Sequence, residues 1–303
     1  ALRKKYSFIE LYHQPELIAE VTLLPLKTYD LDAAILFSDI LIIPEALGLG
    51  LRFEEGLGPI FERPIQTIKE IELLKKPDIS CFSFVKQGIK NICSELKKPL
   101  IGFCGAPFTV ASYMIEGGST RHFKKTKQWL YRHPDSFHLL LQKIADWSVA
   151  YLRLQIDSGV NAIQIFDSWA NTLADNQFQE FSLRYLQDII QRLDRPKVPV
   201  ILFCRGSSVF APALAKLKPN AIGLDWNCRM QEMRQKIGYP VALQGNLDPD
   251  LLYAPLDKIK AEVNQLLAEM QQDKGFVLNL GHGIAPDVSE EAVRTIVDCV
   301  KKT

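Results

Sequence analysis

The sequence predicts a single α/β domain spanning residues 1–303, a distorted (β/α)8 barrel of the TIM type. Three observations predict this fold. Short apolar runs recur along the chain, helix-period segments separate most of them, and polar residues follow nearly every run. The runs are continuous rather than alternating, which is typical of parallel strands covered on both faces. A barrel of this kind commonly takes ~250 residues as one domain, so the length suits a single core.

Seven runs rich in Ile, Val, Leu and Phe are predicted as strands. They are residues 33–37, 99–105, 162–166, 198–204, 221–225, 240–245 and 276–281. A closed barrel needs eight strands, so we expect the first strand to lie upstream of Ala1. Seven strands would also suit a doubly wound open sheet, but no GxGxxG turn follows any of these runs. The barrel is therefore the favoured prediction.

The segments between the runs have helical periodicity. Residues 135–158 place five apolar side chains on one stripe, and Gly159 is expected to end that helix. Residues 256–272 repeat the pattern, and Ser289 precedes two glutamates as a helix N-cap would. A glycine-containing segment at about residues 51–65 is predicted to form an inserted hairpin. No linker, composition shift or fixed-period repeat divides the chain, which favours one domain.

Composition excludes several classes of protein. The 36 Lys and Arg nearly balance the 35 Asp and Glu, so the charge footprint of a nucleic-acid binder is missing. No apolar run is long enough for a membrane span, and the N-terminal residues lack a signal-peptide core. We therefore expect a cytoplasmic protein without nucleic-acid or membrane partners.

The six cysteines are widely spaced and never form a CxxC pair. They are Cys81, Cys93, Cys104, Cys204, Cys228 and Cys299. Because most lie within apolar runs, we expect reduced, buried thiols that pack like small hydrophobic side chains.

In parallel α/β folds, ligands bind at the carboxyl ends of the strands, so the residues that end each run are candidate site residues. Asp39 stands out because it interrupts the apolar segment "AAILFSDILII". A helix N-cap is the structural alternative for this residue, but the β-branched residues and Pro44 that follow disfavour a helix starting immediately. A functional role for Asp39 is the favoured hypothesis.

The other strand-end residues are weaker signals individually. His282 lies between two glycines, and a hydrogen-bonded structural histidine explains it about as well as a functional one. Asp167 with Ser168, and Asp225 with Trp226, can be explained by capping or by hydrogen bonds at strand ends. Tyr113 lies on a predicted helix near the barrel mouth, where its hydroxyl could donate to a carboxylate, although packing is the commoner role of such a residue.

Several chemistries lack their sequence signatures. The chain has no GxSxG nucleophile elbow and no GxxxxGK[ST] phosphate loop. The remaining histidines fall in helical or loop segments rather than in a compact set of metal ligands. Chemistry without a cofactor or a metal is the prediction.

Taken in order, seven motifs resemble those of the uroporphyrinogen decarboxylase family, its bacterial type in particular. They are "LDAAILFSDIL", "IGFCGAPFT", "YMIEGGST", "IFDSW", "GLDW", "ALQGNLDP" and "NLGHGI", and the match runs from about residue 15 to the end of the chain. The resemblance implies a distorted eight-stranded barrel that works as a cytosolic homodimer without a cofactor. It implies removal of carbon dioxide from the four acetate arms of uroporphyrinogen III, which gives coproporphyrinogen III in haem biosynthesis.

The resemblance also implies roles for individual residues. Asp39 matches the central carboxylate that faces the pyrrole NH groups. Tyr113, Ser168 and His282 match residues that contact the carboxylates or the macrocycle of the substrate, and Phe37 and Phe166 match apolar positions that line the cleft. Arg3 matches a basic position loosely.

The implied chemistry fits an anion at the position of Asp39. Protonating a ring carbon of a pyrrole acetate leaves positive charge on the pyrrole, and a preorganised carboxylate near the NH groups would stabilise that cation. The sequence departs from the family at three places. The arginine motif, which the family bears on the first barrel strand and its loop, is expected before Ala1. Phe108 stands where Trp is frequent, and Arg205 stands where Lys is frequent.

Two alternatives are kept open. A zinc-dependent corrinoid methyltransferase on the same fold would need His and Cys ligands, and Cys104 and Cys204 end strands, but no partner cysteine follows "GHGI". A noncatalytic tetrapyrrole-binding protein would bind porphyrin without releasing carbon dioxide.

Overall fold

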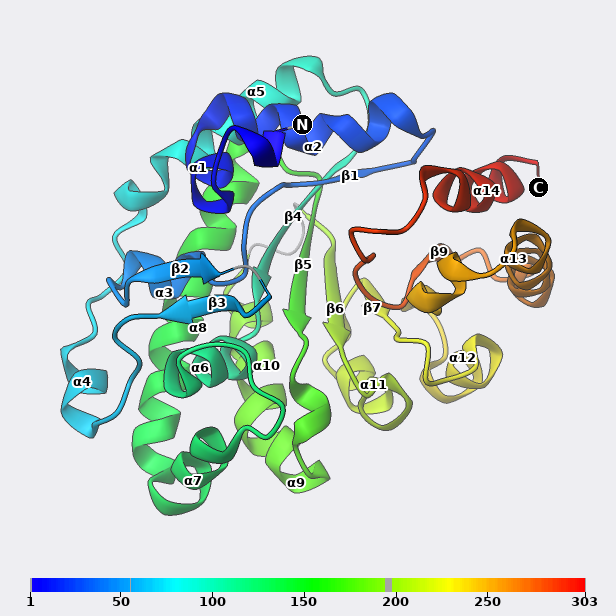
Figure 1. Ribbon diagram of the computed structural model, residues 1–303. Coiled ribbons are helices and arrows are strands. Elements are labelled where there is room, and N and C mark those ends of the chain that lie inside the picture. Colours follow the sequence, from blue (N-terminus) through cyan, green and yellow to red (C-terminus); the bar gives the residue numbers. More distant parts are fainter. Residues whose placement is uncertain (1, 55, 194–197, 303) are drawn as a thin grey trace.

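The computed structural model describes residues 2–54, 56–193 and 198–302. They form a single α/β domain around a curled sheet of parallel strands, with helices on its outer side (Figure 1). The sheet contains β1 (Ala34–Ile35), β4 (Leu100–Gly105), β5 (Ala162–Asp167), β6 (Val200–Cys204), β7 (Ala221–Gly223), β8 (Ala242–Leu247) and β9 (Phe276–Leu280). Each strand pairs with the next one in the chain, which is the winding of a barrel and not of a doubly wound sheet.

All seven predicted runs contain a strand, but β1, β6 and β7 are shorter than their runs by two residues or more. The helices are α1 (Phe8–His13), α2 (Pro15–Thr28), α3 (Ile42–Ala46), α4 (Ile68–Leu73), α5 (Ser83–Glu95), α6 (Pro107–Glu116), α7 (Lys124–Arg132), α8 (Pro134–Ser158), α9 (Asp175–Phe178), α10 (Arg184–Arg192), α11 (Ser207–Lys216), α12 (Met230–Ile237), α13 (Leu256–Met270) and α14 (Glu290–Lys301). Short 3-10 turns lie at Leu2–Lys4, Ile79–Phe82, Ala170–Thr172 and Pro249–Tyr253, and a π-turn lies at Gln179–Leu183. No helix in the described part of the chain is long and apolar enough to cross a membrane.

Two of the long helices form as predicted. The apolar stripe of α8 is fully buried, and Gly159 ends the helix in a left-handed conformation with φ 118°. Ser289 caps α14, since its side chain accepts a hydrogen bond from the backbone N–H of Ala292 at 3.2 Å. In both cases the sequence was sufficient to predict the helix end, because the residues that determine it lie within one or two turns of it.

The sheet is a half-barrel rather than a closed one. Within the described residues β1 and β9 do not pair, and the side chains of Ile35 in β1 and Val277 in β9 are 46% and 48% exposed. The prediction that every strand is covered on both faces is therefore wrong for these two edge strands. Helix α14 connects the two sides instead, because Arg294 donates to the carbonyl of Thr28 at 3.3 Å and Lys301 pairs with Asp32 at 2.5 Å.

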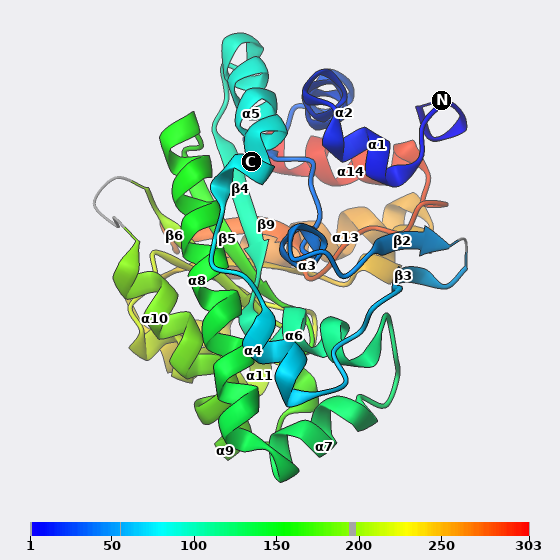
Figure 2. The same cartoon turned by 90° about the vertical axis from the view of Figure 1, so that its left-hand side faces the viewer.

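A separate antiparallel hairpin, β2 (Leu51–Glu54) with β3 (Gly58–Phe61), lies beside the half-barrel (Figure 2). It is attached to the end of α6, since the backbone N–H of Phe61 donates to the carbonyl of Gly117 at 2.9 Å. Gly117 has φ 87°, a conformation that a side chain would disfavour. The hairpin therefore approaches the same strand-end side of the sheet that the βα loops occupy.

The cysteine prediction holds only in part. All six thiols are free, but Cys81 and Cys93 are exposed rather than buried. These two lie on a helical turn and a helix at the surface, and not in a strand. Cys104 and Cys204 end β4 and β6 and are buried as expected, and burial raises the pKa of Cys104 to about 12.

Candidate active site

Asp39 lies after β1 at the strand-end side, with its side chain half-buried. Its Oδ1 accepts a hydrogen bond from the backbone N–H of Leu41 at 2.7 Å. Burial raises the pKa of this carboxyl group to about 6; the Leu41 bond opposes that rise, and the charge of Glu45 adds to it. Asp39 is thus a partly desolvated carboxylate that is still mostly ionised at neutral pH.

A short helix does start close behind Asp39, against the sequence-based expectation. Helix α3 begins at Ile42, and Pro44 lies within its first turn, where no intrahelical N–H bond is lost. Asp39 is not its N-cap residue, because that position is taken by Leu41 without a side-chain cap. The Asp39 carboxylate nevertheless stabilises the turn that leads into the helix, so it combines a local structural bond with free acceptor capacity.

Sequence reasoning missed a group of hydroxyls and a carboxylate around Asp39. The hydroxyl of Tyr12 donates to Glu45 Oε2 at 2.9 Å, and Tyr151 and Ser38 share a hydrogen bond of 3.2 Å. Burial is the main cause that raises the pKa of both tyrosines, and the Asp39 charge adds to it. No sequence signal marks Tyr12 or Tyr151, because each lies on a helix far from Asp39 in the chain.

Tyr113 projects from α6 toward the same region. Its side chain is half-buried, and its ring packs against that of Trp169 with centroids 5.9 Å apart. Burial raises its pKa, and the charge of Asp39 adds to the rise, which places the two groups within electrostatic reach. The structure therefore places Tyr113 and Asp39 in the same region of the molecule.

Asp167 has a structural role. It is fully buried at the end of β5, where Thr109 Oγ1 donates to its Oδ1 at 2.6 Å and Ser182 Oγ donates to its Oδ2 at 2.5 Å. Thr109 in turn accepts from the backbone N–H of Trp169 at 3.1 Å. This network fixes α6 against the loop that carries Ser168, so it sets where Tyr113 and Ser168 lie. Within the described residues, the hydroxyl of half-buried Ser168 has no hydrogen-bond partner.

A row of rings crosses the ends of the strands, and we call it the aromatic row. It consists of Phe103, Phe166, Phe203, His282 and Trp226, whose successive centroids are 5.7, 5.8, 6.0 and 6.3 Å apart. The row joins Phe166 and His282, which the motif match had named separately. Phe203 had a sequence signal, since it is the last residue but one of the next run, and it pairs with Phe166 in the parallel register.

Arg205 completes this end of the row. Its guanidinium lies over the Trp226 ring, 5.5 Å from the centroid, and its side chain makes no ion pair or hydrogen bond with any described residue. Desolvation and the charge of Arg205 lower the pKa of His282, while Asp225 acts in the opposite direction. His282 is therefore mostly neutral at physiological pH and can donate one hydrogen bond.

Asp225 is held by backbone groups much as Asp167 is held by hydroxyls. The N–H of Gly206 donates to its Oδ2 at 2.7 Å, and its own N–H donates to Ser207 Oγ at 2.8 Å. Strand-end hydrogen bonding, the structural alternative given from the sequence, accounts for this residue.

Arg3 and Phe37 form a second group at the hairpin side. Phe8 contacts the rings of Phe37 and Phe53 at 5.7 and 4.6 Å, and the guanidinium of Arg3 lies 5.5 Å from the Phe8 centroid. The sequence offered no reason to place Phe8 here. Neither Arg3 nor Phe37 makes a ring contact with the aromatic row among the described residues.

The two strand-end thiols are directed away from this set. Cys104 and Cys204 are fully buried, and the Cys104 thiol lies near Ser148 of α8, in the layer between sheet and helices. In the part of the chain that the structure describes, no three His, Cys, Asp or Glu side chains are grouped to hold a metal ion.

Comparison with known proteins gives consistent results. The family model described as "Uroporphyrinogen decarboxylase (URO-D)" matches residues 1–303. The uroporphyrinogen decarboxylase of Protochlamydia amoebophila is 65% identical over 303 residues, which is all of this chain and 83% of that protein. The protein of the same name from Actinobacillus pleuropneumoniae serotype 5b is 46% identical over 301 residues, covering 97% of this chain and 85% of that one.

Among solved structures, a methyltransferase from Methanosarcina mazei superposes with a TM-score of 0.84. It is 23% identical, and the match covers 97% of this chain and 87% of that chain, so the likeness concerns the fold alone. The full-length family match and the high identity of the relatives are more specific. The chain therefore belongs to the uroporphyrinogen decarboxylase family.

Proposed function

We propose that this protein is a cofactor-independent carboxy-lyase that removes carbon dioxide from the four acetate side chains of uroporphyrinogen III. The product is coproporphyrinogen III, in haem biosynthesis. The observation that carries the proposal is the half-buried Asp39, with one backbone donor and spare acceptor capacity, in a chain 65% identical to a relative of that name.

Asp39 is proposed as the group that stabilises the reaction's cationic intermediate. A proton added to a ring carbon of the pyrrole leaves positive charge on the ring. Loss of carbon dioxide then leaves an electron-rich exocyclic carbon that takes up a second proton, and the first proton leaves the ring carbon to restore the pyrrole. A fixed anion near the pyrrole nitrogens stabilises that cation at no reorganisation cost. The NH groups of the substrate would donate to Asp39 and so lower its pKa from about 6, which keeps it ionised when substrate is bound.

The remaining residues are proposed to bind the substrate. Tyr113, Ser168 and His282 each have a hydrogen-bond donor for a carboxylate arm, and Arg205 has a cationic one with no competing partner among the described residues. Phe166 and Phe37 are proposed to pack against the macrocycle. Arg3, next to Phe37 through Phe8, is proposed to meet a carboxylate on the hairpin side.

The test replaces Asp39 with asparagine, which keeps the shape and removes the charge. We expect turnover of uroporphyrinogen III, followed as coproporphyrinogen by chromatography, to fall about 100- to 1000-fold. Circular dichroism and thermal unfolding should show that the fold is kept. Asp257→Asn, at a side chain that is 97% exposed, is the matched control and should leave turnover unchanged. A rate in Asp39→Asn near that of the wild type would rule out this role.

The zinc-dependent methyltransferase has less support. Its thiol ligands would have to come from Cys104 and Cys204, which are fully buried, and the structural neighbour that is a methyltransferase is only 23% identical. A noncatalytic tetrapyrrole-binding protein would keep porphyrin binding in the same test and produce no coproporphyrinogen from the wild-type chain.

We also propose a homodimer and a cytoplasmic location, both of which the family resemblance implies. The six free thiols agree with a reducing compartment. Sedimentation at micromolar concentration should give twice the mass of the chain, and a monomer there would contradict the dimer.

A further inference from the structure

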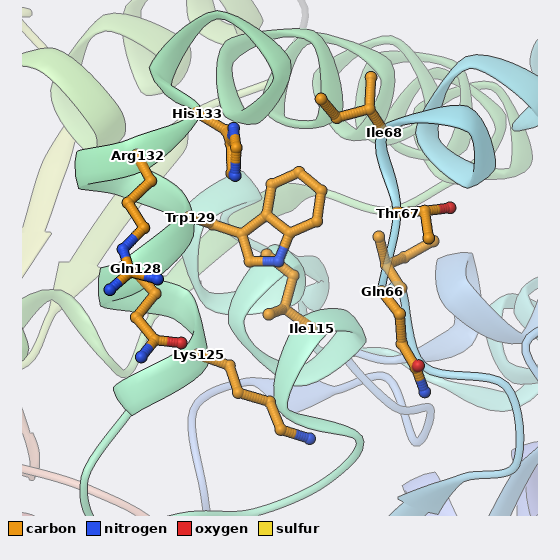
Figure 3. Close-up of a pocket in the computed structure, with 10 residues that line it drawn as sticks. Gln66, Thr67, Ile68, Ile115, Lys125, Gln128, Trp129, Arg132 and His133 are labelled. Atoms are coloured by element: carbon orange, nitrogen blue, oxygen red, sulfur yellow. The ribbon is translucent and has the colours of Figure 1, made fainter.

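Helix α7 and the segment 65–68 line an open cavity of about 550 Å³ that is separate from the strand-end site (Figure 3). None of the residues placed above around Asp39 or in the aromatic row lines it. Helix α6 lies between the two regions, with Tyr113 on the site's side and Ile115 on the cavity's side. Residues that are two positions apart on a helix point in directions about 200° apart, so α6 can direct one side chain to the strand-end site and the other to the cavity.

The floor of this cavity is apolar. Trp129 and Ile115 are 9% and 1% exposed, and Ile65 is buried beside them. Figure 3 shows the indole of Trp129 between the polar side chains of α7 and the segment 65–68. The protein thus covers most of the Trp129 ring, and an apolar group in the cavity would pack against the part that stays exposed.

The rim is cationic and amide-bearing. Lys125, Gln128 and Arg132 lie at positions i, i+3 and i+7 of α7 and so share one face of the helix, and His133 follows them. Neither Lys125 nor Arg132 makes an ion pair or a side-chain hydrogen bond with any described residue. The rim thus has two cationic side chains, Lys125 and Arg132, whose N–H groups donate to no acceptor among the described residues.

Two carboxylates from the helices around the cavity, Glu70 of α4 and Glu116 of α6, are already engaged. Glu70 Oε2 accepts from the backbone N–H groups of Gln66 and Thr67 at 2.7 and 2.8 Å. Glu116 Oε1 accepts from the N–H and the hydroxyl of Thr126 at 2.8 and 2.9 Å. Both pairs stabilise helix starts, so neither glutamate needs the cations for a partner.

We propose that this cavity is a second ligand site, for small carboxylates or sulfonates that have a flat aromatic or conjugated body. Its volume falls within the range of pockets that hold small organic molecules. The anionic group would meet Arg132 and Lys125, and the body would lie on Trp129 and Ile115. The site is independent of decarboxylation, because no residue of the proposed catalytic set belongs to it.

The test uses 1-naphthoate as the probe and 1-naphthalenemethanol as its neutral counterpart, with the full chain labelled at the isoleucine methyl groups. Naphthoate should bind saturably and shift the methyl signals of Ile65, Ile68 and Ile115. The alcohol should bind about tenfold more weakly because it lacks the charge.

Two double variants of equal charge test the cations. Lys125→Gln with Arg132→Gln should weaken naphthoate binding about tenfold, and Lys124→Gln with Lys86→Gln, at exposed positions outside the cavity, should not. Equal loss in both variants, no saturation, or shifts that avoid the three isoleucines would overturn the site. None of these results would change the outcome of the decarboxylase assay. The proposed ligand site can therefore be disproved without disproving the proposed enzyme activity.

Discussion

Asp39 and Asp167 both follow a strand at the same side of the half-barrel, but their surroundings differ. Asp167 is fully buried and accepts hydrogen bonds from two hydroxyls that belong to α6 and to the π-turn. Asp39 is half-buried and accepts one bond from its own turn. Position at a strand end therefore does not distinguish the two carboxylates. Asp167 is structural because hydroxyls already donate to both of its oxygens, whereas Asp39 can still accept hydrogen bonds from a ligand.

The largest effect on stability is expected at Asp167. Asp167→Ala leaves the hydroxyls of Thr109 and Ser182 without their acceptor in a buried site, so the free energy of unfolding should fall by about 3 kcal/mol in urea titrations. Asp157→Ala, an exposed aspartate on α8, should change it by less than about 0.5 kcal/mol. If the two variants were equally stable, Asp167 would not be the structural member of the pair.

A smaller effect of pH is expected at Asp39. Its pKa is raised from 3.8 to about 6 in the folded protein, so the protonated form is the one that folding favours. That contribution is complete below pH 3.8 and is lost as the pH rises through 6. Because Asn cannot ionise, the stability of Asp39→Asn relative to the wild type should be about 2 kcal/mol greater at about pH 8 than at about pH 4.

Asp257→Asn, at an exposed aspartate, is the control for that experiment and should show no such dependence on pH. If the difference between Asp39→Asn and the wild type were the same at both pH values, burial would not be acting on this carboxylate. Asp39 would then resemble an ordinary surface aspartate, and the contrast with Asp167 would need another basis.

Arg234 and Arg205 differ in the same way as Asp167 and Asp39, and the smallest effect is expected for a substitution of Arg205. Arg234 pairs with Asp273 at 2.6 Å and donates to two carbonyls, whereas Arg205 has only the Trp226 ring among the described residues. Arg205→Gln should raise KM for uroporphyrinogen III about tenfold with little change in kcat, and Arg205→Lys should recover part of it. Arg229→Gln, at an exposed neighbouring position, is the control. A fall in kcat with KM unchanged would contradict a binding role.

Much of the fold could be predicted from the sequence because its signals are local. Each strand overlaps a continuous apolar run, and α8 and α14 are set by a stripe, a glycine and a cap a few residues apart. Helix α3 was missed because Pro44 was taken as a helix breaker, although proline fits a first turn. The sequence did not predict that the sheet is open at β1 and β9, because both strands are as apolar as their neighbours.

The site could be predicted only as a set of candidates. Asp39, Asp167 and Asp225 all follow apolar runs, and the sequence alone does not separate them. What separates them is which hydroxyls and N–H groups reach each carboxylate, and Thr109 lies 58 positions away from Asp167. Such long-range partners, like the contact of Phe8 with Phe37, follow from the fold and not from local pattern.

The order of the strands has a consequence for how the chain reaches this structure. Ile201 pairs with Ala221, and Ala221 with Ala242, so β6, β7 and β8 join through loops of about 20 residues. Ala34 must find Leu100 across the hairpin and three helices, and closing that longer loop costs more chain entropy. The part of the site on β6 and β7, with Arg205 and Trp226, thus depends on short-range closure, whereas the position of Asp39 depends on the longest-range pairing in the sheet.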